Sequence, residues 1–341
     1  MRQADTRVVA GVPVEARPAP AAVPAAELDF ADALHDGSML PRLRSLLIAV
    51  DGELVAERYY NGATMARAAN MKSAAKSIIA TLVGIALDRG QIPSVREPIA
   101  RYFPEYLRNQ PEKGAITIED LLTMRSGLET TSNRNYGRWV MSGNWVRFAL
   151  LQPLVAEPGG RMIYSTGSSH LLSAILTRTT GMTTLAFARS TLGAPLGIEI
   201  ASWQRDPQGI YLGGNEMPMR PREMLRIGEL YLNGGRYNGR QVVSEAWVRE
   251  ATTPRTTSRF SGREYGYGWW IRSPGGLRVF YAWGYGGQFI FVVPSLRTVV
   301  VATSVAEAGS ERREHLDAIY GIVERLVIPV VAEASAPDAR D

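Results

Sequence analysis

The sequence predicts an α+β fold in which both ends of the chain build one antiparallel sheet and the middle forms a helical lobe. Apolar runs of strand length lie at about residues 40–60 and again at 265–330, whereas residues 61–264 show the spacing of amphipathic helices. Elements separated along the chain in this way share one core most simply as a sheet with an inserted lobe. The 341 residues are compatible with one large domain, which we place at residues 25–330.

A hairpin opens the sheet at its N-terminal side. The apolar residues 46–50 are followed by Asp51 and Gly52, and residues 53–56 continue the pattern. Asp-Gly between two such runs is typical of a tight β-turn. Near the other end of the chain we expect a helix over about residues 310–326, preceded by strands at 267–272, 277–283, 288–293 and 298–303.

The helices of the lobe are indicated by their start and stop signals. Residues 73–89 carry apolar side chains on one face, and the pattern stops at Gly90. Thr117 opens a short helix with a capping-box pattern, and Pro221 begins a helix that runs to residue 232. Further helices are expected over residues 167–179, over 183–192 and from Ser244 onward.

The two ends have the composition of loose segments. Residues 1–24 are rich in Ala, Pro and Val without periodicity, which predicts a flexible arm, and residues 331–341 predict a loose tail. No apolar run follows a basic start, so we expect no export signal in this chain. The compartment stays open: cytoplasmic if Met1 is the native start, periplasmic or secreted if the chain is a processed form.

Composition excludes several classes of function. The chain has no cysteine and 3 histidines, which excludes thiolate chemistry and leaves little from which to build a metal centre. We therefore expect no metal and no cofactor. The net charge is +5, but the arginines are scattered among acidic residues, so we expect no nucleic-acid partner. No apolar run approaches the roughly 18 residues that a membrane span needs.

Ser73 and Lys76 are the first candidate catalytic residues. Positions i and i+3 lie on the same face of a helix, and Ser73 stands in the first turn, where backbone N–H groups are free. Lys76 is flanked by Ala75 and Ile78, and an apolar setting lowers the pKa of an ammonium. A neutral Lys can take the Ser proton and activate it as a nucleophile. A capping Ser73 followed by a solvated Lys76 is the structural alternative.

Four ordered segments resemble one family. They are Asn-Met-Lys-Ser-Ala-Ala-Lys-Ser-Ile-Ile at 70–79, Leu-Leu-Thr-Met-Arg-Ser-Gly-Leu at 121–128, Tyr-Ser-Thr-Gly at 164–167 and Gly-Tyr-Gly-Gly-Gln at 284–288. In this order they resemble the serine β-lactamases of class C and the penicillin-binding proteins. Within this group, the four segments most resemble those of the family VIII carboxylesterases and the 6-aminohexanoate-dimer hydrolases. The resemblance spans about residues 40–330 and implies a β-lactamase/transpeptidase-like fold.

The resemblance also assigns the remaining catalytic groups. Tyr164 would relay a proton to the leaving group, and the backbone N–H groups of Ser73 and Tyr285 would form the oxyanion hole. The family pattern has Asn two residues after the Tyr, whereas this chain has Thr166. A buried core Tyr with a satisfied hydroxyl is the alternative for Tyr164.

The expected substrate-binding residues depart from the β-lactamase pattern. Where β-lactamases carry Lys-Thr-Gly or His-Thr-Gly to hold the substrate carboxylate, this chain has Ala282, Trp283 and Gly284. The cation is missing, which implies a substrate without that carboxylate. Asn215 matches a segment of the nylon-oligomer hydrolases in which the Asn lines the site, and Tyr136 would contact substrate as a lid residue. Trp283 packed in the core, Asn215 in a turn and Tyr136 in a surface loop are the alternatives.

The histidines do not suggest a Ser-His-Asp triad. His35 lies near the N-terminus, His170 is expected to pack in the core, and His315 lies in the last helix; a Gly-x-Ser-x-Gly elbow is absent. The sequence thus indicates a serine hydrolase that acts through an acyl-enzyme on carboxylic esters or compact amides. A weak β-lactamase or D-amino-acid peptidase, and a non-catalytic binding protein on the same scaffold, are the alternatives. A small-molecule ester or amide is the expected partner, and the oligomeric state stays open.

Overall fold

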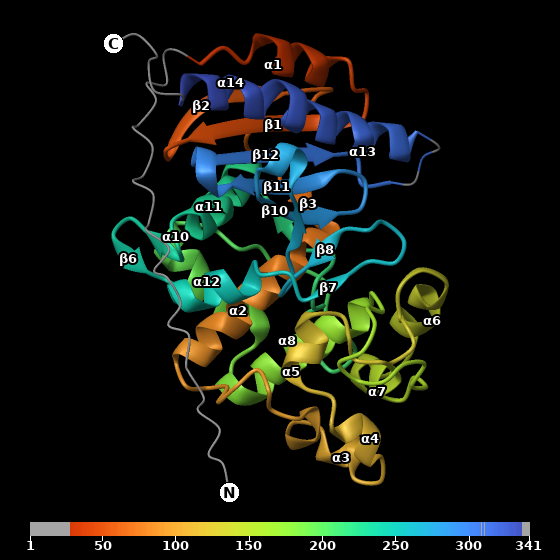
Figure 1. Ribbon diagram of the computed structural model, residues 1–341. Helices are drawn as coiled ribbons and strands as arrows, with labels where there is room; N and C mark the ends of the chain where they lie inside the picture. Colours follow the sequence, from red (N-terminus) through yellow and green to blue (C-terminus); the bar gives the residue numbers. More distant parts are fainter. Residues whose placement is uncertain (1–27, 308, 310, 336–341) are drawn as a thin grey trace, which may run out of the picture.

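A computed structural model describes residues 28–307, 309 and 311–335 of the chain. The predicted arm at 1–24 and the residues from 336 onward lie outside the described residues. Within the described part, eight strands form one sheet in the order β2-β1-β12-β11-β10-β9-β8-β7, and each neighbouring pair is antiparallel. Strands from the two ends of the chain therefore pair within one sheet, as the sequence predicts (Figure 1).

The strands fall into two groups along the sequence. The N-terminal pair turns at Asp51 and Gly52, both with positive φ (51° and 84°), which is the geometry that an Asp-Gly hairpin turn requires. The sheet strands are β1 (Leu43–Val50), β2 (Glu53–Tyr59), β7 (Thr256–Thr257), β8 (Glu264–Tyr265), β9 (Trp270–Arg272), β10 (Val279–Gly284), β11 (Gln288–Val293) and β12 (Thr298–Ser304). Two small ribbons pair β3 (Ala69–Asn70) with β4 (Pro218–Met219) and β5 (Arg236–Tyr237) with β6 (Arg240–Gln241).

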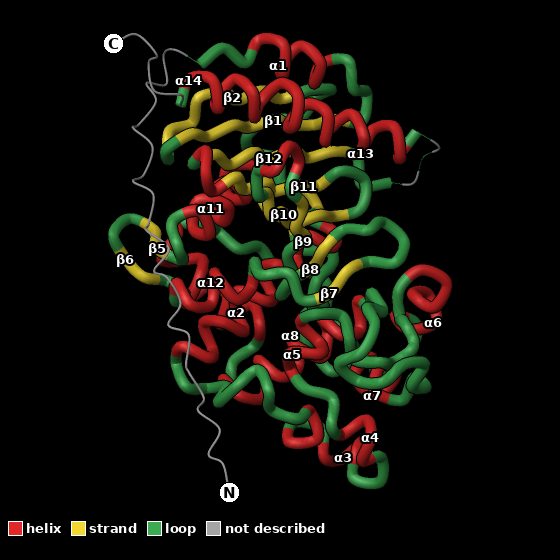
Figure 2. Tube along the Cα trace, viewed as in Figure 1, coloured by secondary structure: helices red, strands yellow, loops and turns green. Residues whose placement is uncertain are grey.

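Helices cover both faces of this sheet (Figure 2). One face packs on α1 (Ala31–Ser38) and on a C-terminal run made of α13 (Arg312–Gly321), a π-helical segment (Ile322–Val327) and α14 (Ile328–Ala334). The other face packs on α2 (Ala75–Asp88) and α11 (Pro221–Leu232). Alternate residues of each central strand supply the two cores: Leu47 and Ala49 join one, whereas Leu46 and Ile48 join the other.

Most of the predicted lobe, residues 61–264, is helical, and α2 connects it to the sheet. Two elements of that range belong to the sheet instead: α11 packs on its face, and β7 is its edge strand, because these segments return to the sheet before residue 265. Helix α2 contacts α8 (Thr166–Thr180) in the lobe and β10 in the sheet. Thr117 forms the predicted capping box at the start of α5 (Ile118–Leu122). The other helices of the region are α3 (Pro104–Leu107), α4 (Pro111–Gly114), α6 (Tyr136–Val140), α7 (Trp145–Leu150), α9 (Thr184–Ala188), α10 (Ala194–Leu196) and α12 (Glu245–Ala251). Short 3₁₀ or π turns join several of them.

The boundaries at the two ends differ from the expected ones. Helix α1 lies at residues 31–38, where no helix is expected from the sequence because the apolar pattern there is short. Contacts with β1 and the π-helical segment hold this helix in place. Helix α14 runs to Ala334, into the segment from 331 that is predicted to be loose, because Val327, Ile328 and Val331 continue the buried stripe. No helix among the described residues is long and apolar enough to span a membrane.

Candidate active site

The start of α2 brings Ser73 and Lys76 together. Ser73 lies in a 3₁₀ turn, η2 (Lys72–Ala74), that leads directly into α2, and Lys76 stands one turn further on. Lys76 Nζ lies 3.0 Å from Ser73 Oγ, which is hydrogen-bond distance. The Ser73 side chain is half-buried, whereas Lys76 is only 3% exposed. The pair thus has the geometry of a nucleophile with an adjacent base.

Lys76 is buried among uncharged partners. Its Nζ donates a hydrogen bond of 2.8 Å to the Gly214 carbonyl and lies 3.3 Å from Thr166 Oγ1. No carboxylate is among its hydrogen-bond partners in the described part of the chain, and burial lowers the pKa of Lys76 to about 7. A large fraction of the lysine is therefore neutral near pH 7 and able to accept a proton.

Tyr164 lies beside this pair. Its ring centroid is 5.1 Å from Lys76 Nζ, and the ring stacks on Trp270 at 5.9 Å and meets the edge of Tyr265 at 6.3 Å. Burial raises the pKa of Tyr164 to about 12, and the hydroxyl of Ser73 opposes this shift in part. The phenol is consequently protonated at neutral pH, so it can give a proton to a leaving group but does not compete with Lys76 as the base.

Thr166, which stands where the family has Asn, keeps a contact with the lysine. Its Oγ1 lies 3.3 Å from Lys76 Nζ and 3.0 Å from Ser132 Oγ, and its backbone N–H donates to the same Ser132 oxygen at 2.9 Å. Thr166 therefore joins the polar network around Lys76 together with Ser132.

Tyr136 and Asn215, expected at the site from different segments, meet in the structure. Asn215 Nδ2 donates to Tyr136 Oη at 3.0 Å, and Asn215 Oδ1 accepts the N–H of Glu216 at 3.0 Å. Asn215 directly follows Gly214, whose carbonyl binds Lys76. The same loop thus contacts both Lys76 and Tyr136, while the lid role of Tyr136 and the contact of Tyr136 and Asn215 with substrate stay predictions.

The end of β10 lies against the nucleophile turn. A Cβ on Gly284 would come within 2.0 Å of the carbonyl oxygen of Met71, two residues before Ser73, so only glycine allows this approach. Tyr285 follows in the turn to β11, with its side chain 39% exposed and the Arg312 guanidinium 4.7 Å from its ring centroid. The backbone of Tyr285 is thus carried close to the Ser73 turn, and its oxyanion role stays a prediction.

Trp283 and Ala282 point to opposite faces of the sheet. The half-buried Trp283 ring stacks on Phe289 at 6.3 Å and meets Trp270 at 5.6 Å, and Trp270 in turn stacks on Tyr164. A wall function of Trp283 toward substrate stays a prediction. Ala282 is fully buried in the core shared with α2, so no cation stands at this position of the strand.

Sequence reasoning missed two polar connections. Lys72 Nζ forms an ion pair of 2.7 Å with Glu216, and Asn70 Nδ2 donates to the same carboxylate at 2.6 Å, which ties the nucleophile turn to the loop after Gly214. The adjacent glycines Gly213 and Gly214 could have indicated this connection, since glycine pairs allow the backbone to approach another segment closely. His170 and His315 bind Asp206 and Ser304 rather than Ser73.

The chain is similar to named proteins and to solved structures. The chain is 27% identical over 283 residues to the 6-aminohexanoate-dimer hydrolase of Paenarthrobacter ureafaciens, covering 76% of this chain and 72% of that protein. A structure of a candidate 6-aminohexanoate-dimer hydrolase from Bacillus anthracis is similar with a TM-score of 0.72 at 21% identity, over 93% of this chain and 88% of that one. A family VIII carboxylesterase gives a TM-score of 0.66 at 17% identity, over 86% and 98% of the two chains.

The family assignment follows from the length of the match. The family model described as Beta-lactamase matches residues 44–323, which include both strand groups of the sheet, the whole lobe and the Ser73–Lys76 turn. Amidase and esterase relatives share the fold, and together they indicate a hydrolase. The chain belongs to the beta-lactamase family.

Proposed function

We propose that this chain is a serine hydrolase that acts through an acyl-enzyme on carboxylic esters or compact amides. The observation that carries the proposal is the 3.0 Å contact between Ser73 Oγ and a buried Lys76 whose pKa is lowered to about 7. An ordinary surface lysine would be almost entirely charged at that pH and unable to take a proton. The solvated-lysine alternative is incompatible with 3% exposure.

The acylation step uses three side chains. Ser73 Oγ attacks the carbonyl carbon of the substrate and transfers its proton to Lys76 Nζ, giving a tetrahedral intermediate and an ammonium. The bond to the leaving alcohol or amine then breaks, and Tyr164 gives that group a proton while it recovers one from the Lys76 ammonium. The product of this step is an acyl ester on Ser73.

Deacylation reverses the proton path. Water attacks the acyl carbon and gives a proton to neutral Lys76; the bond to Ser73 Oγ then breaks, the Lys76 ammonium returns that proton to Ser73 Oγ, and the carboxylic acid is released. In both steps the oxyanion would be bound by the N–H groups of Ser73 and Tyr285. Support for this assignment comes from the Ser73 position at a helix start and from the contact between Gly284 and Met71.

The buried Ala282 favours substrates without a carboxylate beside the scissile bond. A charge-assisted contact contributes about 1.5–3 kcal/mol, so its absence lowers kcat/KM for carboxylate-bearing β-lactams by roughly 10–100-fold. Similarity to a protein named 6-aminohexanoate-dimer hydrolase supports short linear amides as substrates alongside esters. Neutral p-nitrophenyl esters are therefore the first substrates to try.

The test is a substrate panel run on wild type, on Ser73→Ala and on Ser202→Ala, which removes an exposed serine hydroxyl as the matched control. The panel contains p-nitrophenyl esters, linear amides and a chromogenic cephalosporin. We expect turnover of esters or amides that is lost by about 10³–10⁶-fold in Ser73→Ala and kept in the control. A phosphonate probe should label Ser73 alone.

Two results would overturn the proposal in different ways. Cephalosporin turnover as fast as the best ester would identify a β-lactamase. No turnover of any member together with no phosphonate labelling would identify a binding protein on this scaffold.

A further inference from the structure

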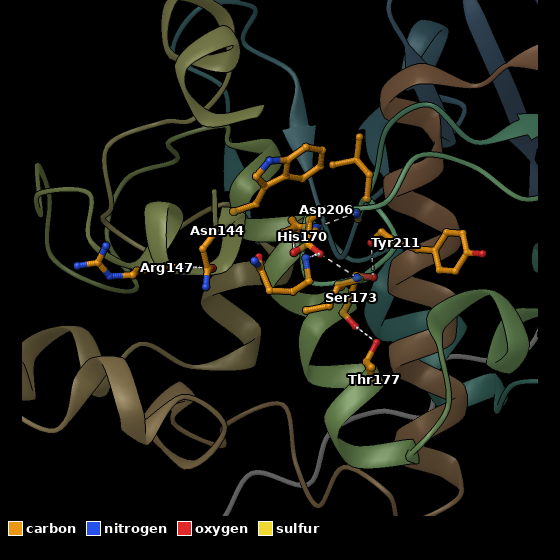
Figure 3. Close-up of polar contacts among 12 residues, drawn as sticks. Asn144, Arg147, His170, Ser173, Thr177, Asp206 and Tyr211 are labelled. Carbon is orange, nitrogen blue, oxygen red and sulfur yellow. Dashed lines mark hydrogen bonds and ion pairs between the residues drawn. The ribbon is translucent and has the colours of Figure 1, made fainter. Parts of the chain in front are cut away.

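A buried histidine and aspartate lie next to the Gly213–Gly214 segment that contacts Lys76, and they have no role in the proposed chemistry. His170 lies on α8 and Asp206 on the loop before Tyr211; both side chains are fully buried, and His170 Nε2 lies 3.1 Å from Asp206 Oδ2 (Figure 3). An Asp–His pair of this kind usually orients the imidazole toward a third group. That third group is not Ser73 here.

The third group is a backbone amide. The N–H of Gly213 points at His170 Nδ1 at 3.4 Å. An N–H donor requires a bare nitrogen, so Nδ1 is the acceptor and Nε2 carries the proton that it donates to Asp206. The other Asp206 oxygen accepts the N–H groups of Gln208 and Ile210, both at 2.8 Å, which holds the carboxylate in place. One tautomer of His170 therefore satisfies every contact.

The Gly213–Gly214 backbone is tightly packed between α8 and Lys76. A Cβ on Gly213 would come within 2.1 Å of the Ser169 carbonyl oxygen, and a Cβ on Gly214 within 2.4 Å of Lys76 Cγ. The next atoms along the chain are the Gly214 carbonyl, which accepts the shortest hydrogen bond of Lys76, and Asn215. A shift at Gly213 is consequently passed to the lysine.

Two indole rings also border His170. Trp139 and Trp145 meet the imidazole edge-on at 5.6 and 5.5 Å, and both indole N–H groups are used by backbone carbonyls of their own segment. Asp206 is the charged group that faces the ring among the described residues that contact it. The orientation of the imidazole thus depends on Asp206 and Gly213.

We propose that His170, oriented by Asp206, is a positioning residue that fixes the Gly214 carbonyl and through it the proton-accepting nitrogen of Lys76. This rests on the proposed function, because it assigns a task within the same site. His170 touches neither Ser73 nor the expected position of the substrate. Its loss acts on kcat and on the ionisation of Lys76 rather than on substrate affinity.

Variants that exchange single polar groups distinguish a positioning role from simple packing. His170→Asn keeps an oxygen near the place of Nδ1 and can still accept the Gly213 N–H, whereas His170→Gln keeps a donor near Nε2 and loses that acceptor. Asp206→Asn presents an amide to Nε2, which favours the other tautomer and turns a donor toward Gly213. All three remove one buried polar contact, so each is a control for the others.

The readout is the pH profile of kcat/KM on a p-nitrophenyl ester, with kcat and KM measured separately. A carbonyl acceptor favours the ammonium form, so losing it lowers the pKa of Lys76. In His170→Gln and Asp206→Asn we expect the acid limb to move to lower pH by about half a unit or more, with kcat reduced about tenfold and KM nearly unchanged. His170→Asn should stay within about threefold of wild type in kcat. An acid limb that does not move to lower pH in His170→Gln and Asp206→Asn, or a His170→Asn variant as impaired as those two, would overturn the proposal.

A measurement on the wild-type protein covers variants that fail to fold. With 3 histidines in the chain, ¹⁵N-labelled imidazoles can be assigned by NMR after replacing His35 and His315 one at a time. We expect a neutral His170 with its proton on Nε2; a proton on Nδ1 overturns the proposal. This NMR measurement does not depend on enzymatic activity, so it distinguishes failure of the positioning role from failure of the proposed hydrolase function.

Discussion

Replacing Lys76 by Arg tests the proton transfer directly. Arg keeps the positive charge and the helix but cannot be deprotonated in a protein, whereas Lys76 has a pKa of about 7. If Lys76 accepts the Ser73 proton, Arg should be as damaging as Lys76→Met, which has neither charge nor base. If the lysine only supplies a positive field, Arg should retain far more activity than Met.

The size of the effect follows from the ionisation. At pH 8, about nine-tenths of a group with a pKa near 7 is neutral, whereas fewer than about one in 10⁴ guanidinium groups is. General-base catalysis contributes about 10²–10⁴-fold, so we expect the acylation rate of the Arg variant to fall by about that factor. The Gly214 backbone packs tightly against the stem of Lys76, and so Lys76→Met also controls for disturbed packing.

The assay is the pre-steady-state release of p-nitrophenolate from a short-chain ester, followed by stopped flow at pH 8. Circular dichroism and thermal unfolding establish that each variant is folded. An Arg variant that acylates at more than about one tenth of the wild-type rate would refute the general-base role, because a permanently charged group cannot accept the proton.

Three further predictions follow from the same residues. In wild type, kcat/KM should rise with pH to a plateau, with an acid limb near pH 7, because Lys76 must lose its proton; an acid limb below about pH 5 would contradict this. Between about pH 7 and 10, Lys76 is protonated in the unfolded chain but neutral in the folded protein, so the free energy of unfolding of wild type should rise with pH. Urea unfolding should show a rise up to about 1.4 kcal/mol per pH unit steeper than that of Lys76→Met. Equal slopes for the two proteins would refute the buried neutral lysine. Gly214→Ala should reduce kcat about tenfold or more, whereas Gly52→Ala in the β1–β2 turn, with nearly the same φ (84° against 89°) but no neighbour within 4 Å, should cost stability alone; equal activity losses would show that backbone strain explains both.

Local signals account for the parts of the fold that the sequence predicts well. Helix α11 has its predicted bounds because Pro221 fixes the first turn and the apolar stripe ends at Leu232. Strand β11 likewise matches residues 288–293, since glycines precede it and Pro294 follows. Ser73 and Lys76 could be paired from spacing alone, because one helical turn separates them.

Contacts between distant segments could not be predicted in the same way. The Gly214 carbonyl reaches Lys76 across 138 positions, and the Asp206 carboxylate reaches His170 across 36. Neither carries a periodic or capping signal, since a carbonyl is present at every residue. His170 was expected to pack in the core, and it does, but its polar partners depend on a loop whose path only the tertiary structure gives.

The order of strands in the sheet has a consequence for how the protein is made. Strand β1 is bonded on one side by β12, so Leu43 pairs with Ser304 across almost the whole chain. During synthesis, the N-terminal hairpin leaves the ribosome long before its partner strand exists, with one edge unpaired and its apolar residues uncovered. Helix α2 likewise lacks β10 until that strand is translated. The protein therefore completes its sheet only after translation of β12, and folding through such distant pairings is slow.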